Sequence, residues 1–362
     1  MRRRVLAALA AGLLLLTGCS GGGGLPYARE MGDMALLRTL GVDGDGNSVK
    51  VTVSTGRRAR GLQREAETPL VLSAERASLS GACLAIQGLS DNYVFYGYVD
   101  QLLLGETQSR AGILTVLDYF AQDVELGLGT QAWVIRGRAE DAVWGGGDNG
   151  VDSRLATLHT DSEMGAAGMT RTVGETLSQL LEDGSAYLPA LSAADGEETT
   201  LVEAGYAVFS GERLAGWLEG EAARGLELLE NQVSADIFEG NAADGAVLRV
   251  TAVRTTVRPV MTGGQLSGVT VRCKLTADVA EARQEVDEDE LEGICRQLEV
   301  RETARIRAAL EQMQQWNADC IGLGRRLGAA APAEWGRWQE DWAKLFPQLE
   351  LSIAVEATVR RV

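Results

Sequence analysis

The chain of 362 residues carries 34 Lys and Arg against 51 Asp and Glu, which gives a formal net charge of −17 at pH 7. The phosphate backbone of nucleic acids repels so acidic a chain, and this excludes nucleic acid as a partner. Apolar residues make up 45% of the sequence, enough to bury a core, and the length corresponds to two or three domains. The single histidine, His159, excludes mechanisms that need two imidazoles.

Residues 1–18 have the pattern of a signal peptide. Three arginines precede an apolar run at 5–16, and the stretch ends in Leu-Thr-Gly-Cys. The run is shorter than the roughly 20 residues that a membrane span requires. Its ending resembles the bacterial lipobox, which implies cleavage before Cys19 and acylation of that cysteine. We therefore expect a lipid anchor at Cys19 on the outer face of the cytoplasmic membrane. The alternative is an ordinary secretory signal with an accidental cysteine.

Residues 19–29 contain Cys19 and a Gly-rich spacer, whose glycine run at 21–24 is typical of a flexible linker. The other cysteines form no Cys-x-x-Cys pair and have no histidine partner; they are Cys83, Cys273, Cys295 and Cys320. Zinc sites and thioredoxin-like motifs need such groupings, so buried thiols are the expectation. The sequence predicts neither a metal nor a cofactor.

The first block, residues 30–195, alternates the patterns of strands and helices. A hairpin is predicted over 34–53, with its turn at the Asp/Gly cluster 42–47. This cluster superficially matches a calcium loop, but Ser48 and Ser54 occupy positions where Gly and Glu are required. Further on we predict helices over 74–89, 111–122 and 173–181, strands over 98–104 and 131–136, and a loop over 145–168. The alternation predicts an N-terminal α/β domain.

Two smaller blocks follow a polar, acidic stretch at 192–200. In the middle domain, residues 196–262, we predict strands over 205–210, 213–217 and 246–260 and a helix over 219–229. In the C-terminal domain, residues 263–362, we predict a strand over 269–279, a long helix over 287–322, a short helix with three tryptophans, and a closing strand over 349–359. The predicted fold class is α+β, with three mixed α/β domains and mainly antiparallel sheets.

Several residues that could carry chemistry also have a structural explanation. The acidic run 285–290 could supply the paired carboxylates of a glycosidase, but acidic residues at a helix N-terminus also complement the helix dipole. His159 lies in a polar, Gly-rich stretch, which favours an exposed structural residue over a catalytic base. Trp335, Trp338 and Trp342 share one helical face, which favours core packing over a partner interface. Gly322 and Gly324 fit the C-terminal cap of the long helix.

Six short motifs follow the lipobox in a definite order. They are Glu-x-x-Asp to Gly-Val-Asp at 30–43, Phe-Tyr-Gly-Tyr to Gly-Glu at 95–106, Asp-Tyr-Phe to Leu at 118–126, Gly-Tyr-Ala-Val-Phe to Leu-Ala-Gly at 205–216, Glu and Arg-Gly-Leu at 221–226, and Gln-Gln-Trp-Asn-Ala-Asp-Cys-Ile-Gly-Leu-Gly at 314–324, followed by Trp342 and Phe346. In this order they resemble the Ger(x)C family, the lipoprotein C subunits of nutrient germinant receptors in spore-forming bacteria. Tyr98, Val124 and Gly127 stand where that family usually has His, Pro and Arg.

The resemblance implies a non-enzymatic, membrane-anchored subunit of three mixed α/β domains. It would assemble with an A-type multi-spanning subunit and a B-type transporter-like subunit in the spore inner membrane, without a cofactor. Two alternatives remain open from the residues alone. A solute-binding lipoprotein of a transporter would need a two-lobed cleft and a measurable affinity for a small ligand. A secreted hydrolase acting on the cell wall would need a catalytic Asp or Glu, and no particular residue can be nominated.

Overall fold

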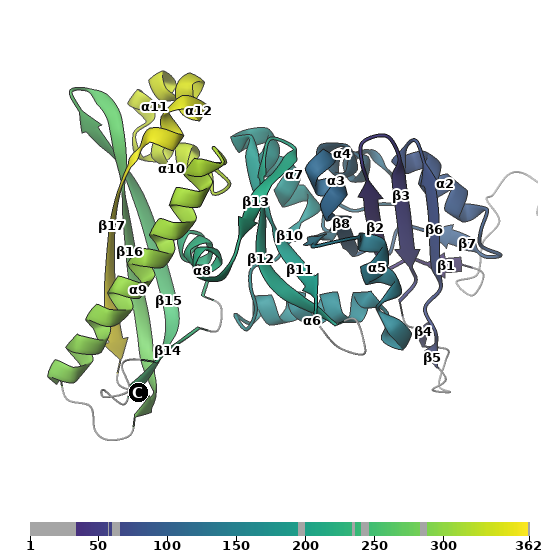
Figure 1. Cartoon of the computed structure of the whole chain (residues 1–362), viewed down its shortest axis with the longest axis horizontal. Coiled ribbons are helices and arrows are strands. Elements are labelled where there is room, and N and C mark those ends of the chain that lie inside the picture. Colours follow the sequence, from purple (N-terminus) through teal and green to yellow (C-terminus); the bar gives the residue numbers. More distant parts are fainter. Residues whose placement is uncertain are drawn as a thin grey trace, which may run out of the picture. The chain divides into compact units, whose positions relative to one another are not determined.

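The computed structural model describes residues 34–56, 58–59, 66–194, 200–233, 236–239, 246–282 and 288–360 (Figure 1). The signal peptide, Cys19 and the spacer lie outside the described residues, so the model does not bear on those predictions. Ala35–Val362 form one compact unit. The division of this unit at 195/196 and 262/263 into three domains stays a prediction.

The larger sheet is mixed and has a parallel centre. Strands β2 (Thr39–Gly44), β8 (Gln101–Gly105), β9 (Gln131–Ile135) and β11 (Ser185–Ala193) are parallel neighbours. Antiparallel strands extend both sides: β3 (Val49–Ser54) and β6 (Val71–Arg76) beside β2, and β12 (Leu201–Ser210) and β13 (Arg213–Leu218) beside β11. The short β10 (Arg171–Thr172) pairs with β9. An α+β fold is confirmed, and its sheets are more mixed than predicted.

Helices cover both faces of this sheet. Leu102 and Leu104 of β8 belong to the same core as residues of α2 (Leu79–Gln87), α4 (Leu114–Gln122) and α7 (Val173–Asp183). Leu103, which points to the opposite face, belongs to the core formed with α5 (Ala139–Trp144) and α6 (Val151–Glu163). β8 is buried throughout, as expected for a parallel strand covered on both faces. Helix α3 (Glu106–Ala111) follows β8 directly.

The second sheet has the order β14–β15–β16–β17 and packs against a long helix (Figure 1). Its strands are β14 (Ile237–Glu239), β15 (Ala246–Thr262), β16 (Gln265–Ala282) and β17 (Glu350–Arg360). β17 runs parallel to β16, and α9 (Glu288–Gln315) connects the two strands in the chain. Alternate residues of β16 are buried in one core with residues of α9 and α8 (Gly220–Leu229): Val269, Val271, Cys273 and Leu275 from the strand, and Ile294, Leu298, Ile306 and Leu310 from α9.

Three predicted helices have different limits in the structure. The helix predicted over 74–89 is β6 followed by α2, which begins after Ser78, whose Oγ accepts a hydrogen bond from the Gly81 backbone N–H. The long helix ends at Gln315 instead of residue 322, because the chain turns at Asn317, which has a φ of 49°. The tryptophan helix is broken into α11 (Pro332–Trp338), a 3-10 turn and α12 (Trp342–Leu345).

Two predictions about 145–195 had opposite outcomes. The loop predicted over 145–168 was wrong, because most of it is the helix α6, which buries Val151, Leu155 and Leu158. The helix beginning at 173 is confirmed, since α7 has a capping box formed by Thr172 and Glu175 and ends at Gly184 in the left-handed region.

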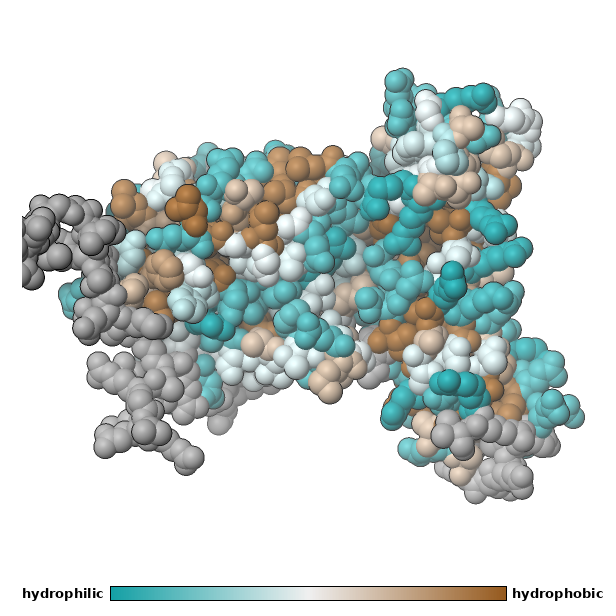
Figure 2. Space-filling view, turned by 180° about the vertical axis from the view of Figure 1, so that it is seen from behind, coloured by the Kyte–Doolittle hydropathy of each residue, from teal (hydrophilic) through white to brown (hydrophobic). Residues whose placement is uncertain are grey.

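The hydropathy of the surface and the length of the helices are relevant to membrane association. On the face shown in Figure 2, hydrophobic and hydrophilic residues are intermixed. None of the helices within the described ranges is both long enough and apolar enough to cross a membrane.

Candidate functional site

The first motif places a buried carboxylate at the start of α5. Asp43 accepts hydrogen bonds from the backbone N–H groups of Ala139 (2.9 Å) and Glu140 (2.8 Å). Burial raises the pKa of Asp43, while these two hydrogen bonds oppose the rise. Gly105, from the Gly-Glu pair of the second motif, lies so close that a β-carbon there would overlap the Asp43 carboxylate. The two motifs therefore hold β2, β8 and α5 together.

The third motif fixes the chain after α4. The Asp123 carboxylate accepts hydrogen bonds from the backbone N–H groups of Glu125 (2.8 Å) and Leu126 (3.2 Å). Glu125 in turn accepts from the backbone N–H of Tyr96 (3.0 Å) and from the hydroxyl of Tyr93 (3.2 Å). These bonds tie the loop to β7 (Tyr93–Phe95) and to Tyr96, the residue that follows it.

The three departures from the family pattern are all at exposed positions. Val124 is 98% exposed, Tyr98 is 46% exposed and packs edge-to-face on Phe95 with ring centroids 5.9 Å apart, and Gly127 is exposed. None of these three belongs to the buried core.

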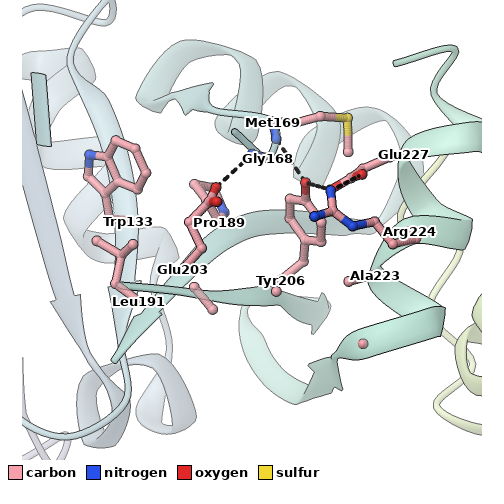
Figure 3. A pocket seen from close by; sticks show the side chains of 13 residues that line it. Trp133, Gly168, Met169, Pro189, Leu191, Glu203, Tyr206, Ala223, Arg224 and Glu227 are labelled. Carbon is pink, nitrogen blue, oxygen red and sulfur yellow. Dashed lines mark hydrogen bonds and ion pairs between the residues drawn. The ribbon is translucent and has the colours of Figure 1, made fainter. Parts of the chain in front are cut away.

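The fourth and fifth motifs converge on a small cleft (Figure 3). Its volume is about 250 Å³, and its lining includes Trp133, Gly168, Glu203, Tyr206, Arg224 and Glu227. The Tyr206 hydroxyl donates to Glu227 Oε1 (2.7 Å) and accepts from the Met169 backbone N–H (2.8 Å). Arg224 Nη1 donates to Glu227 Oε2 (2.8 Å). β12 supplies Glu203 and Tyr206, and α8 supplies Arg224 and Glu227.

Tyr206 stays protonated and acts as a hydrogen-bond donor in this arrangement. Burial raises its pKa well above the usual value, and the neighbouring Glu227 carboxylate raises it further. On the other side of the cleft, the Gly168 backbone N–H donates to Glu203 Oε1 (2.6 Å). Both carboxylates of the cleft are thus engaged by protein donors, which suits fixing geometry better than transferring a proton.

A network of charged side chains joins α8, α9 and residue 236 beside the cleft. Arg305 Nε donates to Glu221 Oε2 (2.6 Å), Arg305 Nη1 donates to Glu302 Oε1 (3.1 Å), and Arg305 also pairs with Asp236. Arg301 donates to Asp236 Oδ2 (2.8 Å) and to Glu302 Oε1 (2.7 Å). Burial raises the pKa of Glu302, although Arg305 and Arg301 oppose the rise. Because each charge is paired and directed, the network fixes how α8 sits on α9.

The sixth motif caps α10 (Leu323–Ala330). Asp319 accepts hydrogen bonds from the backbone N–H groups of Leu323 (2.6 Å) and Gly324 (2.8 Å) and from Trp342 Nε1 (3.0 Å). Gly322 has a φ of 61° and is the N-cap of α10, so its prediction as a C-terminal cap of the long helix was wrong. A β-carbon at Gly324 would lie 2.7 Å from the Trp342 ring, so this motif joins α10 to the tryptophan segment.

Most candidate residues named from the sequence make contacts that stabilise the fold. His159 lies on α6, with Nδ1 2.9 Å from the Thr170 hydroxyl. Trp338 is buried, and Trp335 and Trp342 pack edge-to-face with centroids 5.8 Å apart. Of the acidic run, residues 288–290 form the exposed first turn of α9, and 285–287 lie outside the described residues.

Two further results concern metal binding and the charged network of α8 and α9. Over the described part of the chain, His, Cys, Asp and Glu form no cluster of three that could hold a metal. The charged network of α8 and α9 was not predicted. Its only signal in the sequence is the polar interruption of the apolar pattern near Glu302.

Comparisons with known proteins agree with this arrangement of motifs. Residues 27–193 match the family model described as "Spore germination protein N-terminal domain", and residues 204–362 match the one described as "Spore germination B3/ GerAC like, C-terminal". A search of solved structures matches the crystal structure of the GerBC protein, with 15% identity, a TM-score of 0.59, and coverage of 93% of this chain and 98% of that chain. At this identity the likeness shows the fold alone. A search of curated proteins found no match.

The fold and the paired family matches define a spore germination protein with an N-terminal and a C-terminal part. The resemblance found in the sequence motifs is thereby confirmed. The chain belongs to the GerAC-like family of spore germination proteins.

Proposed function

We propose that the chain is the membrane-anchored C subunit of a nutrient germinant receptor. It acts through assembly with the A-type and B-type integral membrane subunits and not through catalysis. Acylated Cys19 anchors it on the outer face of the spore inner membrane, and its body consists of the three domains proposed above. The observation that carries this proposal is the presence of both family regions, in order, over residues 27–193 and 204–362.

The hydrogen bonds made by residues in and beside the motifs support a role in assembly. Asp43, Glu125, Glu227 and Asp319 each accept hydrogen bonds that join separate elements. Such residues keep a surface in one shape, and a rigid surface binds a partner at a lower entropic cost. These hydrogen bonds therefore suit a protein that presents a surface to a partner better than one that turns over a substrate.

The test is nutrient-triggered release of dipicolinic acid from spores that lack the gene. Deletion should abolish the response to one class of nutrient and leave a non-nutrient trigger effective, and the wild-type gene should restore the response. A tagged chain purified from spore membranes should recover A-type and B-type subunits. Unchanged germination with every nutrient, together with no recovery of these subunits, would contradict the proposal.

A second function, a solute-binding lipoprotein of a transporter, would place its ligand in the cleft beside Tyr206. Its volume of about 250 Å³ lies just below the usual range for small-molecule sites, about 300–1,000 Å³. Calorimetry of the chain from residue 20 with amino acids and sugars tests it. Saturable heats that disappear in Glu203→Ala would favour this function, and an absence of heat across the panel would leave the receptor subunit as the better proposal.

A further inference from the structure

The β15–β16 hairpin concentrates positive charge in an otherwise acidic chain. From residue 249 to residue 274 the sequence has five basic residues and no acidic one, whereas the whole chain has a net charge of −17. The five are Arg249, Arg254, Arg258, Arg272 and Lys274, and all are exposed. The net charge of this segment is therefore opposite in sign to the net charge of the whole chain.

Four of these side chains lie together on one face of the sheet. Arg254 is directly opposite Lys274 in the antiparallel register, and Arg272 is opposite Thr256, between Arg254 and Arg258. The alternating partners Val271, Cys273 and Leu275 are buried against α9, so the basic side chains occupy the face that α9 does not cover. We name Arg254, Arg258, Arg272 and Lys274 the cationic face.

One pair in the cationic face is costly for the sheet itself. Arg254 and Lys274 are like charges directly opposite each other, which destabilises a strand pair. Lys274 has a partner in Glu356 (3.0 Å). Arg254, Arg258 and Arg272 make no ion pair with any residue that the structure describes. Three arginine charges are thus left for a partner outside the described chain.

The closed end of the same hairpin lies at the upper left of Figure 1. Two exposed apolar residues precede the turn there. Val260 is 37% exposed and Met261 is 41% exposed, directly after Arg258 and Pro259. The hairpin closes through Gly263 and Gly264, which have φ of 60° and 82° and would meet no atom within 4 Å if a β-carbon were added. The tip is therefore open, and it combines apolar and cationic groups.

We propose that the cationic face and the tip of the β15–β16 hairpin dock on the surface of an anionic phospholipid membrane. Binding at such an interface combines the burial of apolar side chains with the attraction of basic residues to anionic headgroups. The outward arginines Arg254 and Arg258 are separated by about 13 Å along β15, so both can reach the headgroups of one anionic surface. The docking orients the acidic body away from the membrane. It does not require lipid at Cys19 or a role in a receptor.

The test is sedimentation with vesicles, using the chain from residue 20, which contains the whole compact unit Ala35–Val362 and lacks the acylation site. Binding is compared between phosphatidylcholine vesicles and vesicles with added phosphatidylglycerol. The wild-type chain should bind the anionic vesicles and lose this binding as salt is raised. Arg254→Gln, Arg258→Gln and Arg272→Gln together should weaken it roughly 100-fold, since each basic residue near the surface contributes about fivefold.

Two further variants make the test specific. The matched control carries three neutralised arginines elsewhere: Arg296→Gln and Arg307→Gln on α9 and Arg337→Gln on α11, all exposed. It should bind anionic vesicles like the wild type. Val260→Ser with Met261→Ser should weaken binding while the dependence on salt remains. Unchanged unfolding midpoints show that the variants are folded.

Three results would overturn the proposal. They are an absence of binding to anionic vesicles, equal binding to both vesicle types, and equal losses in the cationic-face and control variants. A different result would be that the wild type does not bind vesicles and that the cationic-face variant no longer recovers receptor subunits. The cationic face would then bind an acidic protein surface instead of a membrane. Loss of vesicle binding is independent of the germination test, so the two proposals can fail separately.

Discussion

Gly225 of α8 lies against the backbone of Arg305 on α9, so close that a β-carbon at position 225 would overlap the Arg305 carbonyl oxygen. The same β-carbon would stand 3.0 Å from the Ala309 side chain. The close approach brings the two helices within reach of the ion pair between Glu221 and Arg305 (2.6 Å). The Arg-Gly pair of the fifth motif therefore marks a helix crossing.

Gly225→Ala should destabilise the protein by about 1–3 kcal/mol, because the added methyl group forces the two helices apart. Urea unfolding followed by circular dichroism measures the change. The control is Gly293→Ala in α9, where a β-carbon would meet nothing within 4 Å. This control should be neutral or should stabilise by up to about 1 kcal/mol through helix propensity. Equal effects at the two sites would show that the crossing does not require glycine.

Asp319→Ala should destabilise the protein by about 1–2 kcal/mol, because it removes the acceptor for two backbone N–H groups at the start of α10. The exposed Asp341, which pairs with Lys344 (2.6 Å), provides the control: Asp341→Ala should change stability by less than about 1 kcal/mol. Similar losses in both variants would argue against the capping role.

The pH dependence of Asp319→Asn has a definite sign. Burial raises the pKa of Asp319, although the hydrogen bonds from Gly324, Leu323 and Trp342 oppose the rise. A carboxyl with a raised pKa in the folded state favours folding below its unfolded pKa and loses that contribution as pH rises through the folded pKa. The wild-type chain should therefore lose its advantage over Asp319→Asn as the pH rises above about 4, the ordinary pKa of an Asp carboxyl. An advantage that grows as the pH rises, measured by urea unfolding, would contradict the raised pKa.

The cysteines should differ in their reactivity toward a thiol reagent at pH 8. Cys83, Cys273 and Cys320 are buried, and Cys295 is half-buried. Burial raises the pKa of Cys273 to about 11, so that about one molecule in a thousand carries the reactive thiolate at this pH. One thiol per chain should react with Ellman's reagent in the folded chain from residue 20, and four in denaturant. Cys295→Ser should remove the reaction of the folded chain, and a second fast thiol would disprove the assignment.

Cys19→Ala should release the full-length chain from membranes into the soluble fraction after a high-salt wash, since the lipid anchor is lost and salt weakens the cationic face. Fractionation of sporulating cells with an immunoblot measures this. The buried Cys83→Ala is the control and should stay with the membrane. Cys19→Ala protein that stays in the salt-washed pellet would show that another contact is sufficient for attachment.

The elements that the sequence predicted well contain their own local signals. α7 has Thr172 and Glu175 at its start and Gly184 at its end, so hydrogen bonds within a few residues define it. α6 was missed because its first turn follows a glycine-rich stretch and its few apolar residues, such as Leu155 and Leu158, are diluted by polar ones. Burial of these residues depends on Leu103 and Trp133, which are distant in the sequence.

The site was less predictable than the fold. The family resemblance identified Asp319 and also its partner Trp342. It identified Glu221 but not the partner Arg305, which is 84 residues away along the chain and belongs to no motif. A charged residue in a helix, such as Glu302, usually faces solvent, and only the packing of α8 shows that this one is buried. The cationic face likewise depends on the register that places Arg254 opposite Lys274.

Because β17 is the last strand of the chain, its parallel pairing with β16 also means that the C-terminal core is completed last. Leu351, Ile353 and Val355 pack against the core formed by β16 and α9, yet they follow both elements in the chain. The core of this part of the chain therefore cannot be completed before its last strand is present, although β16 and α8 already cover part of the apolar side of α9.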